Sequence, residues 1–133
     1  MPAPVPAEEA QRLARLHALS VLDSGTEPLF DALTRSAALV TGAPMALLAL
    51  VDGERPWFKS RVGLAGLDKT PRASDFSEYA MLAEGLMEVV DARADPRFAD
   101  NPLVTGSPHV RFLAGAPLQL GDGLRVGALC VFD

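Results

Sequence analysis

The stretch DARADPRFADNPLVTGSPHVRFLAGAPL, residues 91–118, holds most of the unusual chemistry of this chain. It opens with a polar loop, passes through a proline-initiated turn of predicted helix at residues 96–99, and continues through a second loop, residues 101–108. The final residues alternate with a period of two, which predicts a strand. One face holds Val110, Phe112, Ala114, Ala116 and Leu118, and the other holds Arg111, Leu113, Gly115, Pro117 and Gln119. Long loops that feed a sheet often carry binding sites, although a well-packed surface loop is the alternative.

The segments that flank this stretch predict further strands of the same sheet. Residues 87–90 form a short strand before it, and Gly121-Asp122-Gly123 forms a hairpin turn after it. Residues 124–132 are almost entirely apolar, which predicts a central strand that is covered on both faces. Because this strand ends directly before Asp133, we expect the chain to be part of a longer protein.

The N-terminal half predicts two helices and a hairpin. A helix at residues 7–22 carries apolar residues on more than one side. A second helix begins near Glu27 and Pro28 and stops at Gly42, and its inner face is expected to contain Phe30, Leu33, Ala37 and Val40. Residues 45–51 predict a central strand, and residues 55–62, which contain a proline, predict an edge strand. On that edge strand Trp57, Lys59 and Arg61 alternate with Phe58, Ser60 and Val62.

A short helix is predicted to follow the glycine-containing loop of residues 63–73. Ser74 or Asp75 is expected to cap this helix, and Phe76, Met81 and Tyr79 are expected to point inward. The order of all these elements predicts an α+β fold with a mostly antiparallel sheet. A chain of 133 residues is long enough for one domain with its own core, so we expect residues 1–133 to form a single domain.

Composition and charge exclude several classes of function. The net charge of -5 and the absence of a Lys/Arg cluster argue against binding to nucleic acid or to an anionic membrane surface. The longest apolar run, residues 43–51, is too short to cross a bilayer. A single cysteine, Cys130, excludes an internal disulfide and suits a reducing compartment. We therefore expect a cytoplasmic location.

Five segments closely resemble the GAF domains found at the N-terminus of bacterial signalling proteins. They are RLARLHALSVLDSGTEPLFDALT (residues 12–34), LVDGERPWFKSRVGL (50–64), DARADPRFADNPLVTG (91–106), VRFLAGAPL (110–118) and GALCVFD (127–133). This resemblance implies a central antiparallel sheet with helices packed on one face. It also implies a roof of loops and a short helix over a candidate ligand pocket on the other face.

The chain departs from that family at positions where chemistry would occur. Similar domains usually have a Phe-Cys-x-His pattern where this chain has Phe76-Ser77-Glu78-Tyr79, and an aromatic residue in place of Leu113. Some family members reduce free methionine-(R)-sulfoxide with several cysteines, and one cysteine cannot complete that cycle. We therefore expect that the chain is not an enzyme, and a methionine-(R)-sulfoxide reductase is the alternative. Cys130 is expected to be a buried structural thiol.

A ligand pocket under the roof and a collapsed, ligand-free core are equally compatible with the sequence. If the pocket exists, the expected contacts are Asp75, Phe76, Ser77, Tyr79, Phe98, Asn101, Arg111, Phe112 and Leu113. The identity of any cofactor is not predicted. Neither the two histidines nor Asp91, Asp95 and Asp100 have the spacing of a metal site. Asp95 is expected to cap the following turn, and Arg97 and Arg111 are expected to pair with nearby carboxylates.

The resemblance implies a sensory or regulatory module, with a histidine kinase or diguanylate cyclase output domain after Asp133. The surplus apolar surface of the helix at residues 7–22 predicts a homodimer through that helix, with Leu16 and Leu19 as contacts. A dimerisation spacer that binds no ligand is the third alternative.

Overall fold

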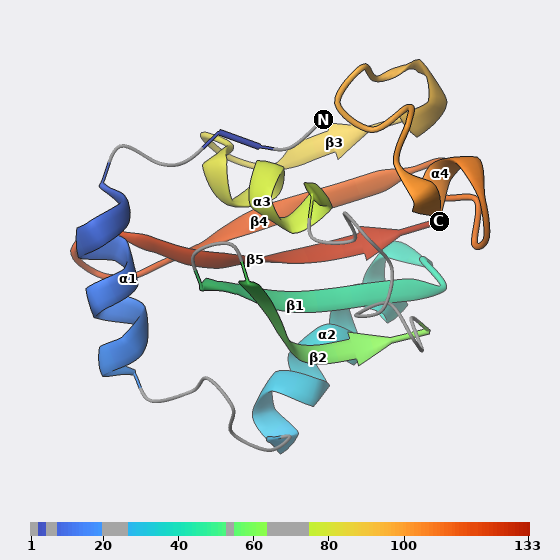
Figure 1. Cartoon of the computed structure of the whole chain (residues 1–133). Coiled ribbons are helices and arrows are strands. Elements are labelled where there is room, and N and C mark those ends of the chain that lie inside the picture. The colour runs from blue at the N-terminus through green and yellow to red at the C-terminus, as the bar shows by residue number, and fades with distance from the viewer. Residues whose placement is uncertain (1–2, 5–7, 20–26, 53–54, 64–74) are drawn as a thin grey trace.

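The computed structural model describes residues 3–4, 8–19, 27–52, 55–63 and 75–133, which form an α+β fold around a five-stranded antiparallel sheet (Figure 1). The strands are β1 (Met45–Asp52), β2 (Arg55–Val62), β3 (Met87–Val89), β4 (Leu113–Gln119) and β5 (Arg125–Phe132). Their order across the sheet is β2-β1-β5-β4-β3. The predicted fold class is therefore confirmed.

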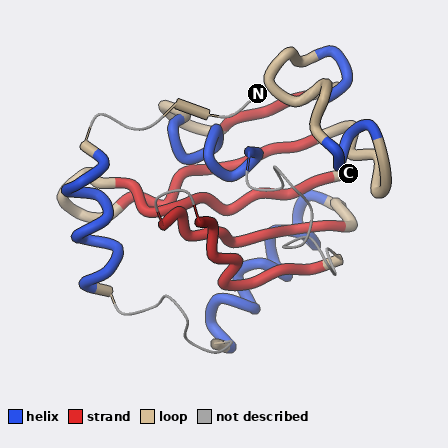
Figure 2. Tube along the Cα trace, viewed as in Figure 1, coloured by secondary structure: helices blue, strands red, loops and turns tan. Residues whose placement is uncertain are grey.

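The helices cover both faces and one end of the sheet (Figures 1 and 2). They are α1 (Glu9–Ala18), α2 (Pro28–Thr41), α3 (Asp75–Leu82), the 3-10 turn η2 (Ala92–Ala94) and α4 (Pro102–Thr105). α2 packs on one face and α3 on the other, while α1 lies beside the turn that joins β4 to β5. The expected cover of helices on one face and a short helix with loops on the other is confirmed.

The two predicted central strands are buried as expected. β5 is the middle strand and pairs with β1 on one side and β4 on the other. Gly127 is required where β5 pairs with β1, because a Cβ atom there would collide with the carbonyl oxygen of Ala49. β2 is an edge strand, as its proline predicted.

The face covered by α3 and the long loop contains one continuous apolar cluster, which we call the roof-side core. Its buried members are Met45, Leu47, Ala49, Phe76, Ala80, Met87, Val89, Ala92, Phe98, Leu103, Val104, Val110, Leu113, Ala128, Cys130 and Phe132. The opposite face contains two smaller groups, which we call the α2-side clusters. Their buried members are Leu16, Leu48, Leu50 and Val126 in one, and Ala38, Ala43, Ala46 and Val131 in the other.

The predicted inner face of α2 is partly wrong. The helix begins at Pro28 and ends at Gly42, whose φ of 73° favours glycine, as expected. However, Thr34 and Ala38 are the buried residues, whereas Leu33 and Val40 are 46% and 86% exposed. Phe30 and Ala37 are partly buried and pack against the sheet as predicted, whereas Leu33 and Val40 turn outward.

The predicted alternation along β2 fails at a β-bulge. The register with β1 shifts between Leu48, which pairs with Ser60, and Ala49, which pairs with Phe58. Lys59 is therefore the extra, unpaired residue of the bulge. Ser60 is consequently buried on the α2 side, where its hydroxyl donates to Asp31 Oδ1 at 2.7 Å. Lys59 is also buried, and its Nζ lies 3.7 Å from Glu27 Oε1. A period-two pattern cannot anticipate one inserted residue.

Two element boundaries also differ from expectation, whereas the start of α3 agrees with it. Residues 96–99 form a hydrogen-bonded turn, and the helix of this region is instead α4, inside the predicted second loop. The strand predicted from Val110 starts at Leu113, because Arg111 and Phe112 donate their backbone N–H groups to Asp133 O before regular pairing begins. α3 begins at Asp75, so its capping position falls on Ser74, outside the described residues.

Candidate functional site

Four aromatic rings form the centre of the candidate site: the predicted Phe76, Tyr79 and Phe98, and also Phe132. Phe76 of α3 lies 5.1 Å from Phe98 and 5.2 Å from Phe132, measured between ring centroids. Tyr79, one turn further along α3, meets Phe98 edge to face at 5.4 Å. Such tilted and edge-to-face pairs add stability beyond their burial. Leu113 is fully buried in the same roof-side core, so four predicted apolar contacts are gathered in one place.

Phe112 does not join them. It packs on the opposite face of the sheet with Ala38, Ala46 and Val131. The reason is the strand period of two, which places Phe112 and Leu113 on opposite faces. Its inclusion among the pocket walls is therefore corrected.

Asp75 and Ser77 place polar groups beneath α3, and both are buried. Burial desolvates the thiol of Cys130 and raises its pKa to about 12. The nearby Ser77 hydroxyl opposes this shift by a smaller amount and makes no hydrogen bond of ordinary geometry. The thiol therefore stays protonated at physiological pH and is a poor nucleophile.

Asn101 and Arg111 hold the loop around α4. The Asn101 side chain is fully buried, and its Oδ1 accepts from the backbone N–H of Leu103 at 2.9 Å, which caps α4. Arg111 Nη1 donates to the carbonyl oxygens of Val104 and Val110, at 3.0 and 3.1 Å. The Arg111 side chain forms no ion pair with a described residue. The hydrogen bonds from Arg93 lower the pKa of Asp91 most, and the charge of Arg111 adds a minor lowering of the same pKa.

The other predicted pairing in this loop is confirmed. Arg97 binds Asp95 through Nε at 3.0 Å and Nη2 at 2.7 Å, and Asp95 Oδ1 accepts the backbone N–H of Arg97. The side-chain hydrogen bond from Arg97 lowers the pKa of Asp95. The guanidinium carbon of Arg97 also lies 5.0 Å from the ring centroid of Phe98 and 5.4 Å from that of Tyr79. This arginine therefore fixes the loop against the aromatic cluster.

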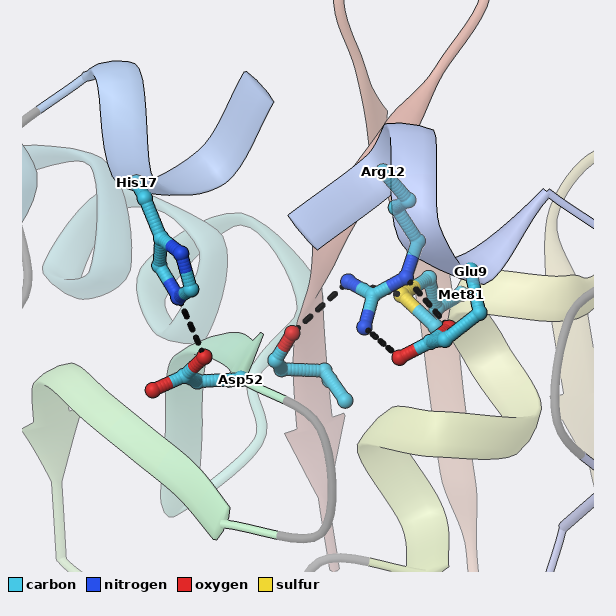
Figure 3. A network of polar contacts seen from close by, with 6 residues as sticks. Glu9, Arg12, His17, Asp52 and Met81 are labelled. Atoms are coloured by element: carbon cyan, nitrogen blue, oxygen red, sulfur yellow. Dashed lines mark hydrogen bonds and ion pairs between the residues drawn. The ribbon is translucent and has the colours of Figure 1, made fainter. Parts of the chain in front are cut away.

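Sequence patterns missed the contacts that attach α1 to the sheet (Figure 3). Arg12 is buried, its Nη1 donates to the carbonyl oxygen of Val51 at 2.7 Å, and its Nε and Nη2 donate to Glu9. His17 Nε2 lies 2.7 Å from Asp52 Oδ1. The position of Arg12 four residues before Leu16, on the buried side of the helix, is the signal that could have revealed it.

Within the described ranges, no group of three or more His, Cys, Asp or Glu side chains is arranged to hold a metal ion. His17 contacts Asp52, whereas His109 is exposed in the loop after α4. No helix in this part of the chain is long and apolar enough to cross a bilayer.

Comparison with known proteins places these observations in a family. A sequence profile described as GAF domain matches residues 25–133. The chain is 42% identical, over 130 residues, to a cyclic di-GMP phosphodiesterase of Pseudomonas aeruginosa. That match covers 98% of this chain but only 22% of the relative, so the chain spans about a fifth of the relative's length.

Solved structures agree on the fold. The GAF domain of a phosphoenolpyruvate-protein phosphotransferase from Coxiella burnetii aligns with a TM-score of 0.60 at 13% identity, over 93% of this chain and 76% of that one. A type II free methionine-R-sulfoxide reductase from Thermoplasma acidophilum aligns with a TM-score of 0.59 at 13% identity, over 79% of this chain and 72% of that one. At such identities the likeness concerns the fold alone.

Proposed function

Because the chain belongs to the GAF domain family, we propose that it is a non-catalytic sensory or regulatory domain of a bacterial signal-transduction protein. The observation that carries this proposal is the 42% identity, along 98% of the chain, to one segment of a cyclic di-GMP phosphodiesterase. Because this relative is a cyclic di-GMP phosphodiesterase, it supports an output domain that turns over cyclic di-GMP rather than the expected histidine kinase output. The chain would then regulate that turnover from outside the catalytic domain.

The chemistry of Cys130 supports a non-enzymatic role. Cysteine acts as a nucleophile only as the thiolate, and burial raises the pKa of this thiol to about 12. It is also the single cysteine of the chain, so a second thiol that could resolve an oxidised intermediate is missing from this sequence. Both observations favour the proposed non-enzymatic role over the chemistry of a methionine-R-sulfoxide reductase.

A small-molecule ligand under the roof remains part of the proposal. Asp75, Phe76, Ser77, Tyr79, Phe98, Asn101, Arg111 and Leu113 are its candidate contacts, and Phe112 is removed from the set. Buried polar groups such as Ser77 Oγ, beside aromatic rings, suit a pocket in which few polar contacts orient an apolar ligand.

Dimerisation through the N-terminal helix is the second part of the proposal. Leu16 is fully buried within the domain, so it is unsuitable as a dimer contact, whereas Leu19 is 40% exposed at the end of α1. Leu19→Glu is expected to weaken self-association measured by light scattering at several concentrations. Val90→Glu, at a 75% exposed residue after β3, is the matched control and should leave association unchanged. Association that responds equally to both variants would contradict a dimer through this helix.

The function itself is tested in two steps. The gene sequence beyond the codon for Asp133 should encode an output domain, and removal of residues 1–133 should alter the rate of cyclic di-GMP turnover without abolishing it. The isolated chain should turn over neither cyclic di-GMP nor free methionine-(R)-sulfoxide in an NADPH-coupled assay. Turnover of the sulfoxide that disappears in Cys130→Ser would overturn the proposal in favour of the reductase.

A further inference from the structure

A cavity lies apart from the roof-side core, where α1, α3 and the β4–β5 turn meet. Its volume is about 270 Å³, close to the lower limit for pockets that hold small molecules. Met81, Leu82 and Leu124 supply apolar lining. Arg12 and Arg125 supply two guanidinium groups.

The two arginines differ in how their charge is compensated. Arg12 forms an ion pair with Glu9 at 2.7 Å (Figure 3), so its charge is neutralised within α1. Arg125 Nη1 donates to the carbonyl oxygens of Met81 and Ala83, which fixes the guanidinium group against the end of α3. Carbonyl oxygens accept hydrogen bonds without cancelling a full charge. Arg125 makes no ion pair with a described residue. Its Nε and Nη2 donate no hydrogen bond to these residues.

A planar carboxylate is bound best by a fixed guanidinium group that has two nitrogens available to donate, because two parallel N–H groups match the two carboxylate oxygens. Glu8 also lines the cavity, but its side chain is exposed, so water and salt screen its charge. The apolar lining favours a ligand with a compact aliphatic part. We propose that this cavity binds a small aliphatic carboxylate through Arg125.

Such a ligand would contact α1 and α3 at once. Binding to the docked arrangement stabilises that arrangement by mass action, so an occupied cavity holds the N-terminal helix against the domain. Ligand binding at this site would act directly on α1. The site does not depend on a pocket under the roof or on the identity of an output domain.

The test is a titration of the 133-residue chain with isovalerate, followed by ¹H–¹⁵N NMR that includes the Nε–H signals of arginine. Saturable shifts are expected for Arg125 Nε–H and for amides of Leu82 and Leu124. Isoamylamine has the same aliphatic part with a cationic head and should produce no saturable shift. Sodium sulfate at equal ionic strength should not reproduce the shifts.

Two variants test whether Arg125 is the binding group. Arg125→Gln should weaken isovalerate binding by about tenfold or more, as expected for a lost hydrogen bond to a charged group. Leu124→Glu keeps the bonds from Arg125 to α3, but it offers an internal carboxylate that should compete with isovalerate and abolish binding. Arg35→Gln, at an exposed arginine of α2, is the control and should bind as the parent does.

Binding should also slow amide hydrogen exchange in α1. Absence of saturable shifts, equal shifts with isoamylamine or sulfate, or unchanged affinity in a folded Leu124→Glu variant would each overturn the proposal. These outcomes concern binding to the chain alone, so they are independent of any result on cyclic di-GMP turnover.

Discussion

The two faces of the sheet are stabilised in different ways. Among the described residues, the roof side has one apolar cluster of sixteen buried residues, whereas the α2 side has two clusters of four buried residues each. Polar contacts supplement the smaller clusters: Ser60 with Asp31, Lys59 with Glu27, and Arg12 with Val51 O. A continuous apolar cluster must open as a unit, while polar contacts at a helix can break separately. The buried residues of α1 are Arg12 and Leu16, so this helix is attached by one buried polar contact and one buried apolar side chain, and we expect movement first at α1.

The largest effect is expected from Phe98→Ala on the roof side. Phe98 is fully buried between Phe76 and Tyr79, so its removal should cost about 3–5 kcal/mol in the free energy of unfolding measured with urea. Leu50→Ala in an α2-side cluster is the comparison and should cost about 2 kcal/mol, because several of its neighbours are only half-buried. Equal losses would remove the distinction between the two faces.

Gly115→Ala tests how tightly α3 packs on the sheet. An added Cβ would lie 2.7 Å from Ala80 Cβ and 2.8 Å from Cys130 Sγ, so α3 must shift. Overpacking of this kind should cost about 1–3 kcal/mol. Gly121→Ala, in the β4–β5 turn, meets no atom within 4 Å and should be neutral or slightly stabilising in the same thermal unfolding assay. A neutral Gly115→Ala would mean that the roof is loosely packed.

Asp95→Asn tests the loop that Arg97 fixes to the roof. The pKa of Asp95 is lowered from 3.8, mainly by the hydrogen bond from the Arg97 side chain. A carboxylate with a lowered folded-state pKa contributes stability above its unfolded value and loses that contribution as the pH falls through the folded value. The variant should therefore be less stable near neutral pH by under about 1 kcal/mol, and this gap should close in acid. If the difference in stability between the variant and the parent does not change with pH, the loss must come from packing rather than from the charge of Asp95.

Val40→Ser should have the smallest effect. Val40 is 86% exposed on α2, and valine and serine have similar helix propensities, so the free energy of unfolding should change by less than about 0.5 kcal/mol. A substantially larger loss in thermal unfolding that grows with protein concentration would indicate that this face is covered in an assembly.

Periodicity was sufficient to predict the main elements of the fold. β1 and β5 are apolar on both faces, and α2 lies between a proline and a glycine, so local composition matches their final environments. The bulge at Lys59 and the outward turn of Val40 depend instead on contacts between distant segments. These contacts leave no mark in a local pattern.

The candidate site was predicted less completely. Phe76, Phe98 and Leu113 gather as expected because each is a large apolar residue on an element that faces the roof. Phe112 was placed wrongly although the strand alternation already separated it from Leu113. The anchoring of α1 by Arg12 was missed because a buried arginine depends on a carbonyl oxygen from β1, far away in the sequence.

Native-state amide hydrogen exchange of the unliganded chain tests the central claim that α1 is the separately mobile element on a rigid roof-side core. The amides of α1 should exchange through an opening of lower free energy than those of α3 and β5. Arg12→Gln should lower the opening free energy of α1 further, while the amides of β5 still exchange only through global unfolding. Equal opening free energies for α1 and β5 in the parent chain would contradict the account, because α1 would then unfold only with the whole domain.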